Sequence, residues 1–246
     1  MSSTSAAPPR ANERQPVKPG IDWAGVAADL DASGMAIVPG LLSAPTCDEL
    51  VACYDDDGLF RSHIHMARHG FGRGEYKYFA APLPETVARL RSTLYAGLAP
   101  IANRWAEALD SPQRFPDTLE GLLARCHASG QTRPTPLLLR YGPGDYNCLH
   151  QDIYGDLVFP LQVAILLAEP GVEFGGGELV LTEQRPRMQS RVTVAPLRKG
   201  DAVAFPVHHR PVQGTRGVYR VNMRHGVSVV TRGRRHTLGI IFHDAK

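Results

Sequence analysis

The sequence predicts an α+β fold that is mainly β, with a double-stranded β-helix (jelly roll) core and N-terminal supporting helices. Two observations lead to this fold class. In the first half of the chain, apolar residues recur every three or four positions, as they do along the buried face of a helix. From Pro136 onward the pattern changes to short Val, Leu and Ile runs separated by Gly and Pro, which is typical of many short strands in two packed sheets.

The helical pattern occurs in four segments before that change. Ser43 or Pro45 is placed to start one of these helices, and Pro84 is placed to start another. The predicted helices cover residues 22–30, 44–54, 84–109 and 115–127.

The strand pattern occupies the second half of the chain. Each segment is a short run rich in Val, Leu, Ile or aromatic residues, and turn-forming residues lie between the runs. The predicted strands cover residues 137–141, 161–167, 178–181, 191–196, 201–205, 219–230 and 236–242.

Composition favours one domain. The chain has 246 residues, of which 43% are hydrophobic and 21% charged, so it is long enough to bury one sizeable core. We predict a single domain over residues 21–246, with helical support at 21–130 and the jelly-roll catalytic core at 131–246.

The first residues and the cysteines indicate where the protein resides. Residues 1–20 are polar and lack the apolar core of a signal peptide, so we predict a flexible tail. No run approaches the ~20 apolar residues of a membrane span. The four cysteines form no regular framework, as expected in a reducing compartment. We therefore expect a cytoplasmic protein without a membrane partner.

One short motif carries the strongest chemical signal. His150 and Asp152 are two residues apart, and on an extended segment such side chains point the same way and can hold one ion. A second histidine, His225, lies far downstream. Two histidines and a carboxylate occupy one face of an octahedral metal and leave the opposite face open, an arrangement that suits Fe(II) with a co-substrate and O₂.

The chain after His225 predicts an anchor for that co-substrate. Apolar β-formers lie on both sides of a turn at Gly233, so a strand, a turn and a returning strand would bring Arg234 back beside the metal. A guanidinium there would bind the distal carboxylate of a dicarboxylic co-substrate bidentately.

These motifs resemble those of the Fe(II)/2-oxoglutarate-dependent dioxygenases. The stretch HGVSVVTRGRRHTLGIIF (225–242) is similar to that of the prolyl-hydroxylase-like branch. The finer match is to a bacterial group of 2-oxoglutarate/iron oxygenases predicted to act on nucleic acid, and it covers roughly the last two-thirds of the chain. The residues that carry it are LRYGPGDYNCLHQD (139–152), FGGGEL (174–179), KGD (199–201) and YRVNMRHGVS (219–228).

The resemblance implies a cofactor set and residue roles. It makes His150, Asp152 and His225 both the iron ligands and the catalytic residues, and Arg234 the anchor of 2-oxoglutarate. Tyr141 is then a candidate for co-substrate binding, equally well read as a core aromatic, because a buried phenol needs a hydrogen-bond partner in either case. Gln162 interrupts an apolar strand, and its inward amide is a second-rank pocket candidate.

The implied reaction consumes Fe(II), 2-oxoglutarate and O₂ and releases succinate and CO₂ as the substrate is hydroxylated. On an N-methyl group of damaged or modified nucleic acid, the product would break down to formaldehyde. Hydroxylation of a prolyl residue, an amino acid or another small molecule is the alternative within the superfamily. A cupin-like protein that binds a metal without oxygenase activity is the alternative outside it, and an arginine clamp argues against it.

Two further patterns leave the substrate open. Residues 61–79 mix basic with aromatic side chains, which would suit phosphates and stacked bases, and residues 185–235 add further arginines. A net charge of +3 is nevertheless mild. His63 and His65 also share a strand face, although no carboxylate follows them at the spacing of the first motif. No obligate protein partner is indicated.

Overall fold

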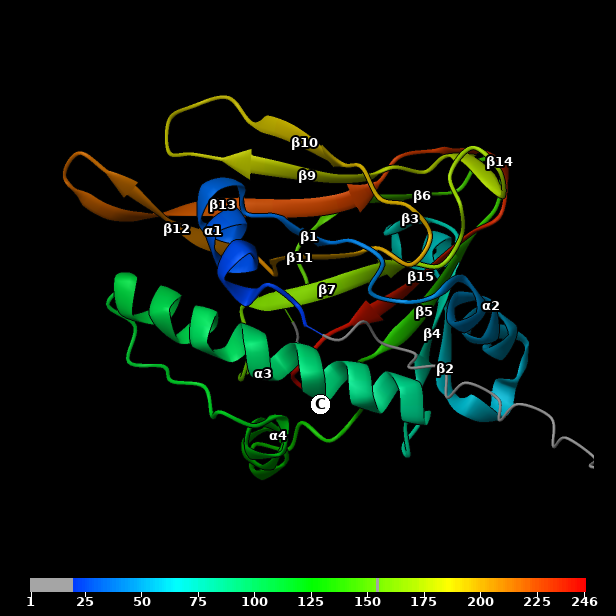
Figure 1. Ribbon diagram of the computed structural model, residues 1–246, viewed down its shortest axis with the longest axis horizontal. Coiled ribbons are helices and arrows are strands. Elements are labelled where there is room, and N and C mark those ends of the chain that lie inside the picture. Colours follow the sequence, from blue (N-terminus) through cyan, green and yellow to red (C-terminus); the bar gives the residue numbers. More distant parts are fainter. Residues whose placement is uncertain (1–19, 154) are drawn as a thin grey trace, which may run out of the picture.

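Two antiparallel sheets face each other, and helices cover the outer side of the larger sheet (Figure 1). This architecture comes from a computed structural model that describes residues 20–153 and 155–246. The predicted tail lies outside the described residues except for Gly20. The predicted jelly-roll core and supporting helices are confirmed.

The larger sheet has seven strands and the smaller one six. In spatial order the larger sheet contains β1 (Ala36–Val38), β11 (Ala202–Pro206), β7 (Leu161–Leu166), β15 (Arg235–Ile240), β5 (Leu137–Tyr141), β4 (Glu75–Phe79) and β2 (Phe60–His65). The smaller sheet contains β10 (Arg191–Ala195), β9 (Leu179–Gln184), β13 (Gly217–Val227), β6 (Tyr146–His150) and β3 (Gly72–Arg73), with β12 (His209–Gly214) paired to β13. A separate pair joins β8 (Phe174–Gly176) to β14 (Val230–Gly233).

Strand alternation divides the interior into two apolar clusters. On β11, Val203 and Phe205 pack between the two sheets, whereas Ala202 and Ala204 pack toward the helices. This follows from the two-residue period of a strand, which sends neighbouring side chains to opposite faces. The space between the sheets is therefore reached only by every second residue of each strand.

Helices fill the other side of the larger sheet. The long helix α3 (Glu85–Ala108) runs along that sheet, and α4 (Leu119–Ala128) lies beyond it (Figure 1). The remaining helices are α1 (Trp23–Ser33), α2 (Ala44–Ala52) and the short 3₁₀ turns η1 (Cys53–Asp55), η2 (Asp57–Leu59) and η3 (Met66–His69). Within the described residues, no helix combines the length and apolar character needed to cross a membrane.

The predicted start of the fourth helix was wrong by four residues. The Thr118 hydroxyl accepts a hydrogen bond from the Gly121 N–H at 3.2 Å, which caps the helix there. Phe115, the predicted start, is held instead by Asn103, whose side-chain oxygen accepts from the Phe115 N–H at 2.7 Å. Phe115 then packs in the core from a loop.

Residues 21–130, predicted as helical support, contain strands as well as helices. This stretch supplies β1, β2 and β4 to the larger sheet and β3 to the smaller one. These strands lack the Val, Leu and Ile runs that marked the later ones, since β2 reads FRSHIH and β4 reads EYKYF. Leu90 and Leu94 of α3 share one apolar cluster with Leu138 and Leu238 of the jelly roll. This shared core supports the prediction of a single domain.

Candidate functional site

A cavity of about 350 Å³ opens between the two sheets. Its walls come from alternate residues of several strands, such as Leu137, Leu139 and Tyr141 of β5 and Thr237 and Gly239 of β15. The cavity is lined by more than apolar groups. Three potential metal ligands, a buried arginine, a buried phenol and a buried amide line it as well.

Strand register brings the three ligands together. His225 on β13 is the direct cross-strand partner of His150 on β6, and their ring centroids are 4.2 Å apart. Asp152 lies just past the end of β6, two residues after His150, so it points to the same side. The predicted grouping of His150, Asp152 and His225 is therefore present.

The three side chains converge on one point. The His150 Nε2 atom is 3.4 Å from Asp152 Oδ1, and the His225 Nε2 atom is 3.2 Å from Asp152 Oδ2. All three ligand atoms lie within 4.8 Å of one another. The His150 Nδ1–H donates to the Cys148 carbonyl at 2.8 Å. Because a carbonyl only accepts, this bond leaves the Nε2 lone pair free for a metal.

Electrostatics keep the carboxylate charged. Burial raises the pKa of Asp152, but the nearby imidazoles of His225 and His150 outweigh burial and hold that pKa well below its usual value. Burial lowers the pKa of His225 more than Asp152 raises it. For His150, burial also lowers the pKa, and the hydrogen bond and charge of Asp152 raise it above the ordinary value. The cluster thus offers an anionic oxygen and two imidazole nitrogens.

Gln151 anchors the segment between the two ligands. Its amide Nε2 donates to the His208 carbonyl at 2.8 Å and to the Met223 carbonyl at 2.9 Å. These two hydrogen bonds tie the end of β6 to the chain around β13. The sequence did not reveal this anchor, because its acceptors are backbone atoms of distant residues.

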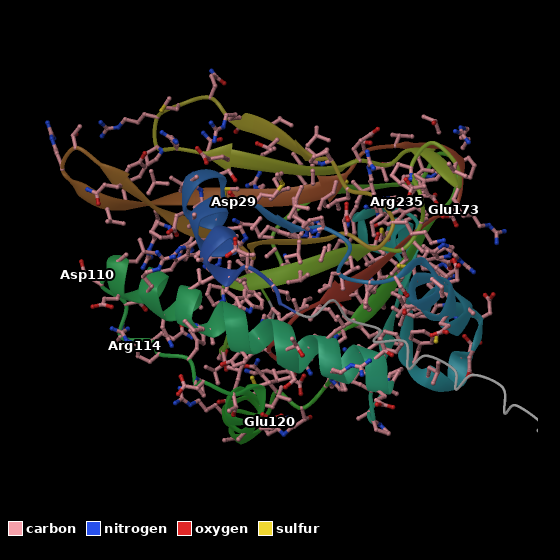
Figure 2. All side chains as sticks on the ribbon, viewed as in Figure 1. Asp29, Asp110, Arg114, Glu120, Glu173 and Arg235 are labelled. Carbon is pink, nitrogen blue, oxygen red and sulfur yellow. The ribbon has the colours of Figure 1, made fainter. Side chains whose placement is uncertain are left out.

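The buried arginine of the cavity is Arg235 and not the predicted Arg234. Arg235 is 2% exposed and lines the cavity, whereas Arg234 is exposed and lines a shallow surface hollow with His65 and Arg140. The reason is strand alternation, since β15 starts at Arg235 and a shift of one residue moves a side chain to the other face. Figure 2 shows Arg235 at the end of the molecule that carries β14, opposite Asp110.

Within the described residues Arg235 makes no salt bridge, and the Glu178 carboxylate acts on its charge only through space. Its Nη1 donates to the Thr237 hydroxyl at 2.5 Å, and its guanidinium lies 5.5 Å from the centre of the Tyr141 ring. Gly177, with φ of +67°, lets the backbone pass close to it, since a Cβ there would lie 2.9 Å from Arg235 Cδ. A buried cation of this kind is costly unless an anionic ligand pairs with it.

Tyr141 and Gln162 lie where the sequence predicted them, in the same cavity. Tyr141 is fully buried, and burial raises its pKa. Within the described chain, neither the Tyr141 hydroxyl nor the Gln162 Nε2 has a hydrogen-bond partner. The same holds for Arg235 Nε. Buried polar atoms of this kind indicate that a polar ligand completes the site.

These observations fit Fe(II) and a dicarboxylate. Two imidazoles and one carboxylate form the facial ligand set of non-haem iron oxygenases, with the open side toward the cavity. The buried guanidinium, phenol and amide are suited to carboxylate oxygens. Fold and donor set together define an oxygenase of the 2-oxoglutarate/Fe(II) class.

Comparison with solved structures agrees with this class at the level of fold. The chain is similar to a Pseudomonas putida prolyl-4-hydroxylase, with a TM-score of 0.52 and 17% identity over 88% of this chain and 96% of that one. It is also similar to a Trichoplax adhaerens prolyl hydroxylase, with a TM-score of 0.53 and 15% identity over 90% and 89% of the two chains.

Sequence comparison is more specific. Two Mycobacterium tuberculosis proteins, both called uncharacterized, are each 48% identical over 167 residues, which cover 68% of this chain and 72% of theirs. A family model described as oxygenase, catalysing oxidative methylation of damaged DNA, matches residues 74–245. The chain belongs to this family, Oxygenase-NA. It is therefore a 2-oxoglutarate-dependent non-haem iron dioxygenase that uses Fe(II), 2-oxoglutarate and O₂. The alternative of a cupin without oxygenase activity is not favoured.

Proposed function

We propose that His150, Asp152 and His225 bind Fe(II), that Arg235 anchors 2-oxoglutarate, and that the substrate is a methylated base in damaged or modified nucleic acid. The observation that carries the residue assignment is the buried, unpaired Arg235 in the cavity that also holds the three ligands. A cytoplasmic location, supported by four free cysteines, is part of the proposal.

Each cavity residue has a role in this scheme. When bound, the iron supplies the oxidising chemistry that couples decarboxylation of 2-oxoglutarate to hydroxylation of the substrate. Arg235 pairs with the distal carboxylate, and Thr237 holds the guanidinium in place. The Tyr141 hydroxyl donates to the same carboxylate. Phe205 packs its ring 4.8 Å from that of His225 and shields this ligand from water.

The mouth of the cavity suits a flat, partly apolar group. Phe71 and Leu149 line it and are 47% and 48% exposed. The Phe71 ring is stacked on His69 with centroids 5.3 Å apart. Exposed aromatic faces bind unpaired bases by stacking, which contributes roughly 1–3 kcal/mol per base. We infer that an extruded or single-stranded base rests against Phe71 while its methyl group reaches the iron.

Charge distribution favours a polyanion. Residues 184–224 contain nine Lys and Arg against one Asp. Four of the nine, Arg185, Arg191, Lys199 and Arg210, pair with carboxylates of the protein. The other five are Arg187, Arg198, Arg216, Arg220 and Arg224. Arg220 and Arg224 are exposed on one face of β13, four residues apart, and Arg224 directly precedes the ligand His225. The β12–β13 hairpin projects beyond the rest of the smaller sheet (Figure 1). Because side chains alternate along β13, Arg224 faces away from the cavity that His225 lines, so phosphates bound by these arginines would lie on the outer face of the smaller sheet.

Demethylation follows from hydroxylation of an N-methyl carbon. One oxygen atom of O₂ enters succinate and the other forms the hydroxymethyl group. The C–N bond then breaks, the nitrogen takes the hydroxyl proton, and formaldehyde leaves. The base is released unmodified. The protein therefore needs only to position the methyl carbon and to exclude water.

The test is turnover of N-methylated single- and double-stranded oligonucleotides, with formaldehyde and succinate measured together. We expect equal amounts of both products. Arg224→Gln should weaken oligonucleotide binding and reduce the salt dependence by about one phosphate contact. Arg89→Gln, on the exposed side of α3, is the matched control and should bind as the wild type does. Stoichiometric succinate with peptidyl proline or a free amino acid, and none with oligonucleotides, would refute the nucleic-acid substrate but leave the oxygenase assignment intact.

A further inference from the structure

A second group of metal-ligating side chains lies on the outer face of the larger sheet. His63 and His65 belong to β2, and Glu75 begins the neighbouring strand β4. Tyr76 and Tyr78, which alternate with Glu75 along β4, line the oxygenase cavity on the other face. The second group is therefore separated from the cavity by the thickness of the sheet, and the proposed function does not use it.

The carboxylate of this group comes from the neighbouring strand of the same sheet. We expected no carboxylate for His63 and His65, because none follows them at the spacing of the His150 motif. Antiparallel pairing supplies one, since Glu75 is the direct cross-strand partner of His65. Directly paired residues have side chains close enough to share a ligand. The sequence alone does not show this pairing.

The three side chains converge on one oxygen atom. Glu75 Oε2 is 2.7 Å from His63 Nε2 and 3.6 Å from His65 Nδ1. The two imidazole centroids are 4.4 Å apart, and all three ligand atoms lie within 4.8 Å of one another. A plain histidine–glutamate hydrogen bond needs only one of the two imidazoles. The His65 nitrogen is too far from Glu75 Oε2 for a hydrogen bond, but it is close enough for all three ligand atoms to surround one cation.

Arg140 orients the carboxylate. Its Nε and Nη2 atoms lie 2.7 and 2.5 Å from Glu75 Oε1, so this oxygen is occupied and Oε2 faces the imidazoles. Hydrogen bonds of this kind to a ligating carboxylate fix its orientation at metal sites. Arg140 is itself held over the Tyr54 ring, with its guanidinium carbon 4.2 Å from the centroid. The ligand oxygen is therefore preorganised.

Local charges leave room for a divalent cation. Arg140 also contacts Asp55 at 3.3 Å, and the nearby Lys77 pairs with Asp57 at 2.6 Å. The two cations therefore have carboxylate partners besides Glu75. With neutral imidazoles, the group carries one net negative charge before a metal binds.

We propose that His63, His65 and Glu75 form a second metal site, which binds Zn²⁺ and ties β2 to β4. Two imidazoles, one carboxylate and a water molecule make a four-coordinate zinc site. The His63 and His65 side chains are 36% and 45% exposed, so the metal would exchange with solvent. Since the opposite face of β4 lines the oxygenase cavity, bound zinc would stiffen one cavity wall.

The test is a zinc titration against a chromophoric chelator, made in the background of a His150→Ala/His225→Ala variant so that the oxygenase site contributes nothing. We expect one equivalent of Zn²⁺ to bind. Adding His63→Ala and His65→Ala together should weaken zinc binding by at least about 100-fold, and adding Glu75→Gln alone should weaken it by at least about tenfold. With Co²⁺ as probe, the visible bands of a four-coordinate imidazole site should appear and then vanish with the same substitutions.

The matched control is His69→Ala, which removes another exposed histidine of the same region. This variant should still bind one equivalent of Zn²⁺. Circular dichroism of each variant shows whether it is folded. No zinc bound in the micromolar range by the His150→Ala/His225→Ala protein would overturn the proposal. So would an equivalent that survives both His63→Ala and His65→Ala. Neither outcome bears on the oxygenase assignment.

Discussion

The protein holds two clusters with the same ligand types, one between its sheets and one on its outer surface. In both, two histidines and one carboxylate meet within 4.8 Å. In the inner cluster Asp152 and His225 are buried, at 7% and 8% exposed, and His150 is partly exposed; the cluster shares a cavity with the buried Arg235. In the outer cluster both histidines are exposed and Glu75 is half-buried, and the neighbouring Arg140 is already paired with Glu75. The two clusters thus have the same ligand types, and their different surroundings decide which chemistry each can support.

Backbone geometry explains why the two clusters look alike. Each uses two side chains two residues apart on one strand and a third from the paired strand, His225 opposite His150 and Glu75 opposite His65. The difference is the face of the sheet. The inner face has a second sheet opposite, which excludes water and supplies the cavity, while the outer face of β2 has none. A buried site with a charged anchor can orient a co-substrate, and an exposed one only retains an ion.

The largest effect should follow from breaking the inner cluster. His225→Ala removes a ligand that no neighbouring side chain replaces in the described chain, so we expect succinate formation to fall on the order of 1000-fold or more. His65→Ala, the corresponding change outside, should lower it by no more than about threefold. Succinate release from 2-oxoglutarate under air, with iron content measured alongside, checks both.

Iron content separates two causes of lost activity in that experiment. If His225→Ala, combined with His63→Ala and His65→Ala to remove the outer cluster, lost activity but retained a full equivalent of iron, the ligand assignment would be wrong. Equal losses of activity in the inner and outer variants would remove the distinction between the clusters.

A smaller effect is expected at the co-substrate anchor, where Arg234 and Arg235 form a natural pair. Arg235→Gln removes the buried cation, and the KM for 2-oxoglutarate should rise roughly 100-fold, as for loss of one partner of a buried charge pair. Arg234→Gln, exposed on the opposite face, should change that KM by less than about twofold. Steady-state kinetics with varied 2-oxoglutarate measures both. A larger change in Arg234→Gln than in Arg235→Gln would restore the assignment made from the sequence.

Arg234 and Arg235 also show how much of the site can be predicted from the sequence. Spacing predicted His150, Asp152 and His225, because a two-residue period and a metal ligand set are local rules. The same reasoning chose Arg234, because the position of the turn at Gly233 decides the face, and one residue of error in that position reverses it. Local rules of this kind could not predict the contacts of Glu75 and Gln151. Their partners are set by strand pairing and tertiary packing, which leave no periodic trace in the chain.

The prediction for the first half of the chain found its helices but missed strands β2 and β4, for a related physical reason. Strands β2 and β4 carry charged or polar residues on both faces, since the outer face holds His63, His65 and Glu75 and the inner face holds the cavity tyrosines. A strand without an apolar run resembles a loop in the sequence. The segments that were predicted well are those whose side chains enter the core.

The smallest predicted effect is the pH dependence of the stability that a buried histidine causes. His243 is fully buried, its Nδ1 accepts from the Phe159 N–H at 3.2 Å, and burial together with the Arg91 charge lowers its pKa from 6.5 to about 4. Because this pKa is lower in the folded state, the unfolded chain takes up the proton first. Stability is then complete above pH 6.5 and decreases as the pH falls toward 4, by roughly 2–3 kcal/mol at most.

Urea unfolding of the metal-free protein at about pH 7.5 and about pH 5 measures this loss. In His243→Gln the pH dependence should shrink by up to one proton, even if the variant is less stable at both values, because the comparison is between slopes. An unchanged slope in His243→Gln would mean that this imidazole is protonated in the folded protein, with the Phe159 N–H left to another acceptor.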